Sequence, residues 1–345
     1  MLRYVKILMT VAFAFSTGSA AIGQVDFTTP APFTSGTKPS ITVVRSGFVI
    51  EVNQSGNDTS YMLGQLSGNT IIWGPSRVFP WKMYNARVSS RDDAPVIAVT
   101  YTGAPAGGGC FYRVGGLDPS AGLDQDISWK TSEEKWGTCD YTRDSRIRFN
   151  LDSKVFGLYS DFSQIYYRRG TMQNFRFVWT NGDIPEYVGD GRDVDFAQRE
   201  DQMVEVYDQT GRGNLQSRPA KGATGGRQLL WGAPVGLPTT NAVHGHVTLN
   251  YSYPAASVVA IYYKAPLGLY TMTGRYIGLG VNTPPGIEWI SPERLIAQGH
   301  VLHSDITNNF TSVIEVHEYQ GQIYYSVGPM PPAHSAVQAS EGPAK

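Results

Sequence analysis

A short run rich in valine and isoleucine returns six times along the chain. Runs of β-branched and aromatic residues bounded by turn residues predict buried β-strands. The six runs are Phe48–Val52, Pro95–Val99, Val155–Tyr159, Met203–Tyr207, Val258–Tyr262 and Val313–His317. A tyrosine-containing segment follows most of them, as in Tyr61–Gly64 and Tyr324–Gly328. The pattern therefore predicts pairs of adjacent strands throughout the chain.

A tryptophan-containing segment completes five of these repeats. The tryptophans are Trp73, Trp129, Trp179, Trp231 and Trp289, at intervals of 50 to 58 residues. Self-similarity at such a period is typical of a repeat architecture. Together with a mixed polar and apolar strand before each valine-rich run, the pattern predicts four short strands per repeat. An aromatic residue at one register is what packing between repeats requires, so we interpret the tryptophans as core residues rather than ligand platforms.

The sixth repeat does not reach a tryptophan, because the chain turns to Pro329–Pro332 first. At the other end, Val25–Pro30 precedes the first repeat with the spacing of an outer strand, and Phe27 stands where a tryptophan is expected. We therefore predict an all-β, six-bladed β-propeller of four-stranded blades, closed by an N-terminal strand that joins the C-terminal blade. A β-helix or a row of separate β-domains is the alternative, and the split blade argues against both.

The N-terminal end of the chain predicts export. A basic start, an apolar stretch and small residues over 1–23 are typical of a signal peptide, so 24–332 would form one propeller domain and 333–345 a disordered tail. We expect a secreted, extracellular or periplasmic protein without a membrane span. Cys110 and Cys139, the only cysteines, then predict a disulfide. The net charge of −1 argues against a nucleic-acid partner.

One column of polar residues precedes an aliphatic residue at the start of each repeat, where inner strands would surround the channel. Its members are Ser40, Arg87, Arg146, Asp193, His246 and His300. Such a varied ring at a concave mouth is typical of a ligand site, although a channel wall is polar in any case. His246 and His300 on neighbouring blades also predict a metal site, for zinc or calcium; otherwise we expect no cofactor.

A second column places acids inside the valine-rich strands: Glu51, Glu205 and Glu315. A buried charge needs a partner, and Arg113 and Arg168 of the following strands are candidates. Arginine and glutamate beside aromatic rings such as Tyr112 and Tyr167 also suit a sugar, which offers hydroxyl groups and an apolar face. A buried structural ion pair explains the same residues equally well.

The first repeat, Val49–Ser76, resembles repeats of secreted lectin-like propellers. Six repeats of about 50 residues are similar to the architecture of fucose-binding propeller lectins. This resemblance implies sugar sites between blades, each built from an arginine, a glutamate and aromatic residues.

No Gly-x-Ser-x-Gly elbow and no P-loop occur in the sequence. We therefore expect a carbohydrate-binding propeller without catalytic activity, whose partner is a glycan or another cell-surface ligand. A channel-centred, metal-dependent hydrolase or lyase acting on polysaccharide remains an alternative, as does a protein-interaction scaffold.

Overall fold

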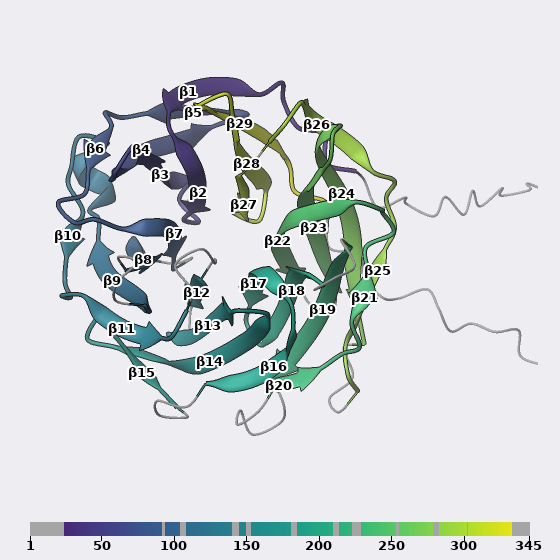
Figure 1. The fold of residues 1–345 in the computed structure, drawn as a ribbon. Helices are drawn as coiled ribbons and strands as arrows, with labels where there is room; N and C mark the ends of the chain where they lie inside the picture. The colour runs from purple at the N-terminus through teal and green to yellow at the C-terminus, as the bar shows by residue number, and fades with distance from the viewer. Residues whose placement is uncertain are drawn as a thin grey trace, which may run out of the picture.

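Six antiparallel sheets are arranged as blades around a central axis (Figure 1). The computed structural model describes residues 24–91, 94–103, 108–139, 145–149, 153–180, 185–209, 214–222, 229–252, 255–278, 283–301 and 303–332. The predicted six-bladed β-propeller is confirmed. The predicted signal peptide and C-terminal tail lie outside the described residues.

The first three blades follow one another along the chain, each from its inner strand outward. Blade 1 consists of β2 (Thr37–Val43), β3 (Phe48–Ser55), β4 (Asp58–Ser67), β5 (Thr70–Trp73) and β6 (Arg77–Val78). Blade 2 consists of β7 (Tyr84–Ser90), β8 (Val96–Thr102), β9 (Cys110–Gly116), β10 (Ser128–Trp129) and β11 (Glu134–Gly137). Blade 3 consists of β12 (Ser145–Phe149), β13 (Lys154–Asp161), β14 (Gln164–Gln173), β15 (Arg176–Trp179) and β16 (Glu186–Asp190).

The last three blades repeat this order. Blade 4 consists of β17 (Arg192–Arg199), β18 (Gln202–Asp208), β19 (Leu215–Gly222), β20 (Leu229–Trp231) and β21 (Val235–Gly236). Blade 5 consists of β22 (Ala242–Ser252), β23 (Ala255–Lys264), β24 (Gly268–Ile277), β25 (Gly286–Trp289) and β26 (Arg294–Gln298). Blade 6 consists of β27 (Ser304–Asn308), β28 (Ser312–Tyr319), β29 (Gln322–Pro329) and the N-terminal β1 (Ala31–Ser35).

Blades 1 to 5 each carry a fifth short strand that the sequence pattern did not predict. After the tryptophan strand the chain returns to pair with the first half of the third strand, as β6 does with β4 through Arg77 and Tyr61. The tryptophan strand occupies only the second half of that edge, with Trp73 opposite Gly64. Two short strands therefore share one edge of each third strand, and together they leave little unpaired backbone exposed.

The N-terminal segment closes the ring as predicted. β1 pairs with β29, Ala31 lying opposite Tyr325. The Thr28 amide donates a hydrogen bond of 2.9 Å to the Val327 carbonyl of β29. In blade 1 the residue after Trp73, Gly74, makes the equivalent hydrogen bond to the Leu63 carbonyl. Phe27 therefore occupies the place of a tryptophan, and β1 the place of a fifth strand.

The apolar core is divided into layers between neighbouring blades. One layer holds Ile50 and Leu63 of blade 1 with Val88 and Val99 of blade 2, all fully buried. Glycine opposite the tryptophan makes room for its ring, since a Cβ on Gly64 would lie 2.9 Å from the indole of Trp73. Each blade is therefore stabilised mainly by its neighbours, as in other repeat folds.

The predicted disulfide is present and joins Cys110 of β9 to Cys139, which follows β11. It fits a protein that folds in an oxidising compartment, secreted or periplasmic. Within the described part of the chain, no helix has both the length and the hydropathy of a membrane span.

We predict that Phe27→Ala destabilises the protein by roughly 2 kcal/mol, because this half-buried ring packs in the layer between blades 5 and 6 at the point of closure. Urea unfolding monitored by tryptophan fluorescence measures the change. Phe162→Ala is the control, since that ring is 76% exposed and its loss should be nearly neutral. Equal effects of the two substitutions would contradict the assigned role of Phe27.

Candidate functional site

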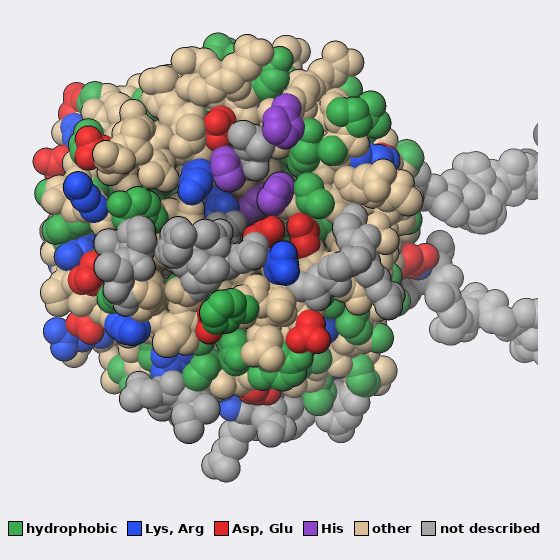
Figure 2. Space-filling model, in the orientation of Figure 1, with side chains coloured by type: hydrophobic (Ala, Val, Ile, Leu, Met, Phe, Trp, Pro, Cys, Tyr) green, Lys and Arg blue, Asp and Glu red, His purple; other side chains and the backbone are tan. Residues whose placement is uncertain are grey.

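Six buried polar side chains, one from the inner strand of each blade, form a collar around the central axis. They are Ser40, Arg87, Arg146, Asp195, His246 and Asp305. None is more than 5% exposed. On the face drawn in Figure 2, histidine side chains gather near the centre of the ring beside acidic and basic ones.

The collar connects blades through backbone amides. Asp305 Oδ2 of blade 6 accepts hydrogen bonds from the Ile41 amide at 2.9 Å and the Ser40 hydroxyl at 2.7 Å, both in blade 1. Ser40 Oγ in turn accepts the Val88 amide of blade 2 at 3.1 Å. The collar aspartate of blade 4 accepts the Val247 amide of blade 5 at 3.2 Å. At three junctions, therefore, a collar side chain binds the inner strand of the next blade.

Arg146 spans the centre of the collar. Its Nε lies 3.0 Å from Asp195 Oδ1 and its Nη2 lies 2.9 Å from Asp305 Oδ2, so one guanidinium joins blades 3, 4 and 6. Burial raises the pKa of both carboxyl groups, but the charge of Arg146 and the contact with His246 outweigh it, and each pKa lies below its usual value. The carboxylates are thus ionised and neutralised within the collar, which is a structural role.

Two predicted members of the ring lie elsewhere. Asp193 sits on a β-bulge between Arg192 and Asp195, with a left-handed φ of 48°, and Asp195 two residues later takes the collar position. His300 is exposed and packs against the Tyr263 ring, with centroids 5.4 Å apart. The blade 6 position belongs to Asp305, so the predictions for Asp193 and His300 as ring members were wrong.

The bulge residues form a second polar tier beside the collar. Lys38, Asn85, Asp193 and His244 all have positive φ and all stand two residues before a collar side chain. Lys38 Nζ donates to Asn85 Oδ1 at 2.6 Å, and His244 Nδ1 lies 3.6 Å from Asp193 Oδ2. In this tier, as in the collar, polar side chains of adjacent blades contact each other.

Two groups of the described residues combine ligand types that suit a metal. One is Asp195, His246 and Asp305, and the other is Asp193, Asp208 and His244. In the first group the guanidinium of Arg146 already binds both carboxylates, so a cation there would meet a like charge. His300 belongs to neither group. The zinc or calcium site therefore stays a prediction, and of the two histidines proposed for it only His246 lies in one of these described groups.

The three glutamates of the valine-rich strands are fully buried, and each has a different partner. Glu51 Oε2 accepts a hydrogen bond from the side-chain amide of Asn53 at 3.0 Å, and burial raises the pKa of Glu51 to about 8. Glu315 binds the imidazole of His317 at 2.6 Å and the hydroxyl of Ser326 at 2.5 Å. These polar groups are enclosed in blade interiors, where a ligand does not reach them.

Glu205 pairs with an arginine that the sequence analysis missed. Arg218 Nε donates to Glu205 Oε1 at 2.6 Å from the adjacent strand. Burial raises the pKa of Glu205 to about 7, although the charge of Arg218 opposes this shift. Arg113 and Arg168 lie opposite Val99 and Gly157, so their predicted pairing with the glutamates was wrong. The intervals between the three arginines match the repeat, a signal that the loss of aromatic residues around Arg218 obscured.

Arg113, Arg168 and Arg218 occupy one column, on β9, β14 and β19, and all three stack on tryptophans at blade junctions. Arg113 lies 3.8 Å from the centroid of Trp81. Arg168 lies 4.9 Å from Trp179, and Arg218 lies 4.6 Å from Trp231. Arg168 and Arg218 also donate to main-chain carbonyls of the preceding blade, those of Trp136 and Val188. A guanidinium–indole contact thus recurs at three successive junctions, with an indole from the segment before β7 at the first and from the blade's own tryptophan strand at the other two.

A cavity of about 350 Å³ opens beside the middle arginine. Its walls include Arg168, Trp136, Tyr159 and Thr138. The Trp136 and Tyr159 rings meet edge to face, with centroids 5.3 Å apart, and Trp136 fills the space above Gly157. Thr138 directly precedes the disulfide cysteine Cys139, so the disulfide ties this wall to β9. Trp136 lies outside the regular tryptophan column, which is why the repeat pattern did not identify it.

The two tyrosines predicted to bind a ligand lie in the core layers. Tyr112 stacks on Phe177 of blade 3 with centroids 4.4 Å apart, and its hydroxyl accepts the Phe177 amide at 3.1 Å. Tyr167 packs between Phe156 and Trp231, and burial raises its pKa. Both rings hold adjacent blades together, and neither lines the cavity beside Arg168.

Solved structures share this fold at very low sequence identity. AofleA from Arthrobotrys oligospora aligns with a TM-score of 0.55 and 7% identity over 90% of each chain. The NanB sialidase from Streptococcus pneumoniae gives 0.56 and 8%, covering 89% of this chain and 70% of its own. The PQQ-bound aldose sugar dehydrogenase from Streptomyces coelicolor gives 0.50 and 9%, covering 90% and 99%. No protein-family model and no curated protein sequence matches the chain.

We predict that Arg146→Ala lowers the free energy of unfolding by about 3–5 kcal/mol, because it leaves two buried carboxylates without their cation. Chemical denaturation at neutral pH measures the loss. Arg275→Ala removes an exposed pair with Glu288 and should cost less than about 1 kcal/mol. A small effect of Arg146→Ala would mean that the collar does not hold the blades together.

Glu51→Gln should stabilise the protein increasingly as the pH rises from about 4.5 to about 8. The pKa of Glu51 is higher in the folded state than in the unfolded state. The free energy of unfolding of the wild-type protein therefore falls across this window, by up to about 3 kcal/mol at neutral pH. Thermal unfolding of both proteins at pH 4, 6 and 8 tests this expectation. A difference in melting temperature that stays constant with pH would overturn it.

Proposed function

We propose that the protein binds a carbohydrate at its blade junctions, with the cavity beside Arg168 as the main site, and performs no chemistry on it. The observation that carries this proposal is the combination of a guanidinium, two aromatic rings and a cavity of about 350 Å³ at one junction. A volume of this order suits a small ligand. The guanidinium can donate to a hydroxyl group of a sugar. The two rings line the cavity but are each only 1% exposed, so they offer little open surface for stacking.

The junctions on either side also contain an arginine beside a tryptophan, but the other residues around the arginine differ. Arg113 stacks on the half-buried Trp81, and its Nε donates to the Tyr101 hydroxyl at 3.3 Å. Tyr101 in turn donates to the exposed Glu133 at 2.6 Å, which brings an arginine, a glutamate and a tryptophan together at the surface. At the next junction, Arg218 is held by the buried Glu205. We infer that Arg113 and Arg168 serve binding, while Arg218 is mainly structural.

Two of the structurally similar proteins carry names that refer to sugars. NanB is named as a sialidase, and the Streptomyces coelicolor protein is named as an aldose sugar dehydrogenase. They favour a carbohydrate ligand without selecting one sugar. Binding without catalysis is favoured by the buried acids themselves, since the collar carboxylates are held by Arg146 and the three strand glutamates are fully enclosed. A general acid or base must come within hydrogen-bond reach of its substrate.

Glycan-array binding of the purified protein, followed by titration of the best ligand, tests the proposal. Arg168→Lys keeps the charge but loses the planar fork, and we expect it to weaken binding roughly tenfold. Thr138→Trp leaves Arg168 in place and fills the cavity from its exposed rim, and it should abolish binding there.

Thr138→Ser is the matched control for the second variant, and melting temperatures of all variants verify that they fold. If both Arg168→Lys and Thr138→Trp bind the glycan with wild-type affinity, the binding site does not lie in the cavity beside Arg168. Failure of the folded wild-type protein to bind any glycan would overturn the proposed function itself.

A further inference from the structure

Three tyrosine rings form a continuous row across blade 3. Tyr159 of β13 lies opposite Tyr166 of β14, and Tyr166 lies opposite Tyr187 of β16, so the three side chains share one face of the sheet. The Tyr159 and Tyr166 rings stack with centroids 5.4 Å apart, and the Tyr166 and Tyr187 rings meet edge to face at 6.1 Å. Each ring of the row therefore contacts the next.

The row runs from the cavity beside Arg168 to the solvent-exposed surface of the blade. Its inner end, Tyr159, is part of the cavity wall and is 1% exposed. Its outer end, Tyr187, is 52% exposed, and Tyr166 between them is partly buried. Pro185, two residues before Tyr187, also lines the cavity, so β16 begins at the cavity rim. The exposed ring thus lies next to the cavity, on the outer part of the blade (Figure 1).

The outer end of the row distinguishes blade 3 from the other blades. Two rings also stack across the second and third strands of blades 2, 5 and 6, as Tyr262 and Tyr270 do in blade 5 at 6.3 Å. This inner pair recurs with the repeat, and packing between blades explains it. At the register of Tyr187, the described strands of the other blades place Val78, Lys135, Gly236, Leu295 and Pro32. Among these described positions, the pair is extended by a third ring only in the blade whose arginine lines the cavity.

Hydrogen bonds hold the two outer rings in place. The Tyr166 hydroxyl donates to Gln164 Oε1 at 2.7 Å, and the Tyr187 hydroxyl donates to Asp190 Oδ1 at 2.8 Å. Gln164 and Asp190 lie opposite each other, and both are exposed. Rings that are already fixed lose little conformational entropy when a ligand binds. The exposed amide and carboxylate beside them can also form hydrogen bonds with hydroxyl groups of a ligand.

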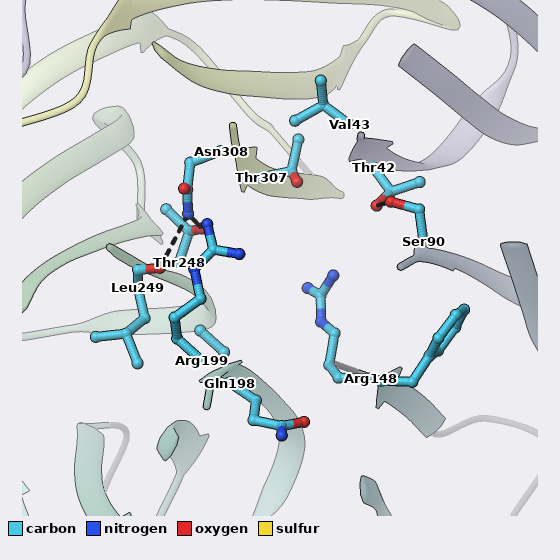
Figure 3. Close-up of a pocket in the computed structure, with 12 residues that line it drawn as sticks. Thr42, Val43, Ser90, Arg148, Gln198, Arg199, Thr248, Leu249, Thr307 and Asn308 are labelled. Atoms are coloured by element: carbon cyan, nitrogen blue, oxygen red, sulfur yellow. Dashed lines mark hydrogen bonds between the residues drawn. The ribbon is translucent and has the colours of Figure 1, made fainter. Parts of the chain in front are cut away.

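The central axis offers no comparable space. The cavity at the end of the inner strands opposite the collar, drawn in Figure 3, has a volume of about 50 Å³, against about 350 Å³ beside Arg168. The smaller volume exceeds the share of one liquid water and falls far short of a sugar ring. Of these two described cavities, the one next to the tyrosine row is therefore the one that has room for a sugar.

We propose that the protein recognises an oligosaccharide, with one sugar unit in the cavity beside Arg168 and a second unit packed on the exposed ring of Tyr187. This inference rests on the proposed function, because it extends the same site. The Trp136 and Tyr159 rings in the cavity wall are almost fully buried, whereas half of Tyr187 is open to solvent. Tyr187 therefore supplies the open aromatic surface that the apolar face of a sugar requires.

Titration calorimetry with sugars of increasing length tests this proposal. The probes are the monosaccharide, disaccharide and trisaccharide that share the terminal sugar of the best glycan on the array. We expect the disaccharide to bind the wild-type protein about tenfold more tightly than the monosaccharide, because packing on one exposed aromatic ring adds an interaction of that order. Equal affinity for the three lengths would overturn the proposal.

Substitution of Tyr187 then locates the second sugar unit. Tyr187→Ala should remove the difference in affinity between disaccharide and monosaccharide and leave the monosaccharide affinity unchanged. Tyr187→Phe keeps the ring and should retain most of that difference, although it loses the hydrogen bond to Asp190. Leu295→Ala is the matched control, because Leu295 occupies the same register in blade 5 and is 38% exposed, so its loss should change no affinity. A difference that persists in Tyr187→Ala would contradict the proposal.

Arg168→Lys separates this inference from the proposed function. It alters the cavity and should weaken the binding of all three sugars by the same factor, so that the difference between disaccharide and monosaccharide remains. If no sugar of any length binds the folded wild-type protein, the proposed function and this inference both fail. If all three sugars bind the wild-type protein equally, the inference alone fails. Melting temperatures of all variants verify that they fold.

Discussion

The ring depends on hydrogen bonds that leave one blade and end on the backbone of the next. A blade buries its apolar faces only against its neighbours, and apolar contacts alone do not specify how far one blade is displaced along the next. Asp305 and Ser40 fix that displacement, because each accepts a main-chain amide at one defined position of the following inner strand. Arg146 then joins three blades across the axis, so the collar sets both register and closure.

The three polar columns have different roles because they face different surroundings. Collar residues meet at the axis, where six strands approach one another and buried charge can be neutralised by a partner. The glutamates of the second strands are enclosed within the blades, and each is satisfied by a different partner, as the contrast between Glu51 and Glu205 illustrates. The arginines of the third strands lie farther out, where the junctions widen enough to leave a cavity beside Arg168.

The sequence was sufficient for the fold because its strongest signals are spacings. Phe27 could be assigned to the missing tryptophan position by counting residues, and the structure confirms it through the Thr28 hydrogen bond. The collar was harder to predict. In blade 4, moving from Asp193 to Asp195 preserves the alternation of polar and apolar residues, so the pattern fits both positions, and only the β-bulge decides between them.

The junction site was predicted in part. Arg113 and Arg168 were identified. Their partners depend on the register between neighbouring strands, and a single sequence does not reveal that register. Arg218 was missed because its strand lacks the aromatic residues used to align the others. Trp136 belongs to a fifth strand whose position follows from the return of the chain to a free edge. Such returns depend on tertiary pairing rather than on local propensity.

Closure by β1 also has a consequence for the order of folding. Every other strand pair joins segments close in sequence, whereas Ala31 and Tyr325 meet from opposite ends of the chain. During synthesis the N-terminal strand is made first and its partner last, so five blades can assemble while the edge of β29 does not yet exist. The final pairing carries the largest loop-closure entropy of the molecule. Until it forms, the nascent propeller is an open arc with two unsatisfied blade faces, and this is the stage at which it is most exposed to association with other chains.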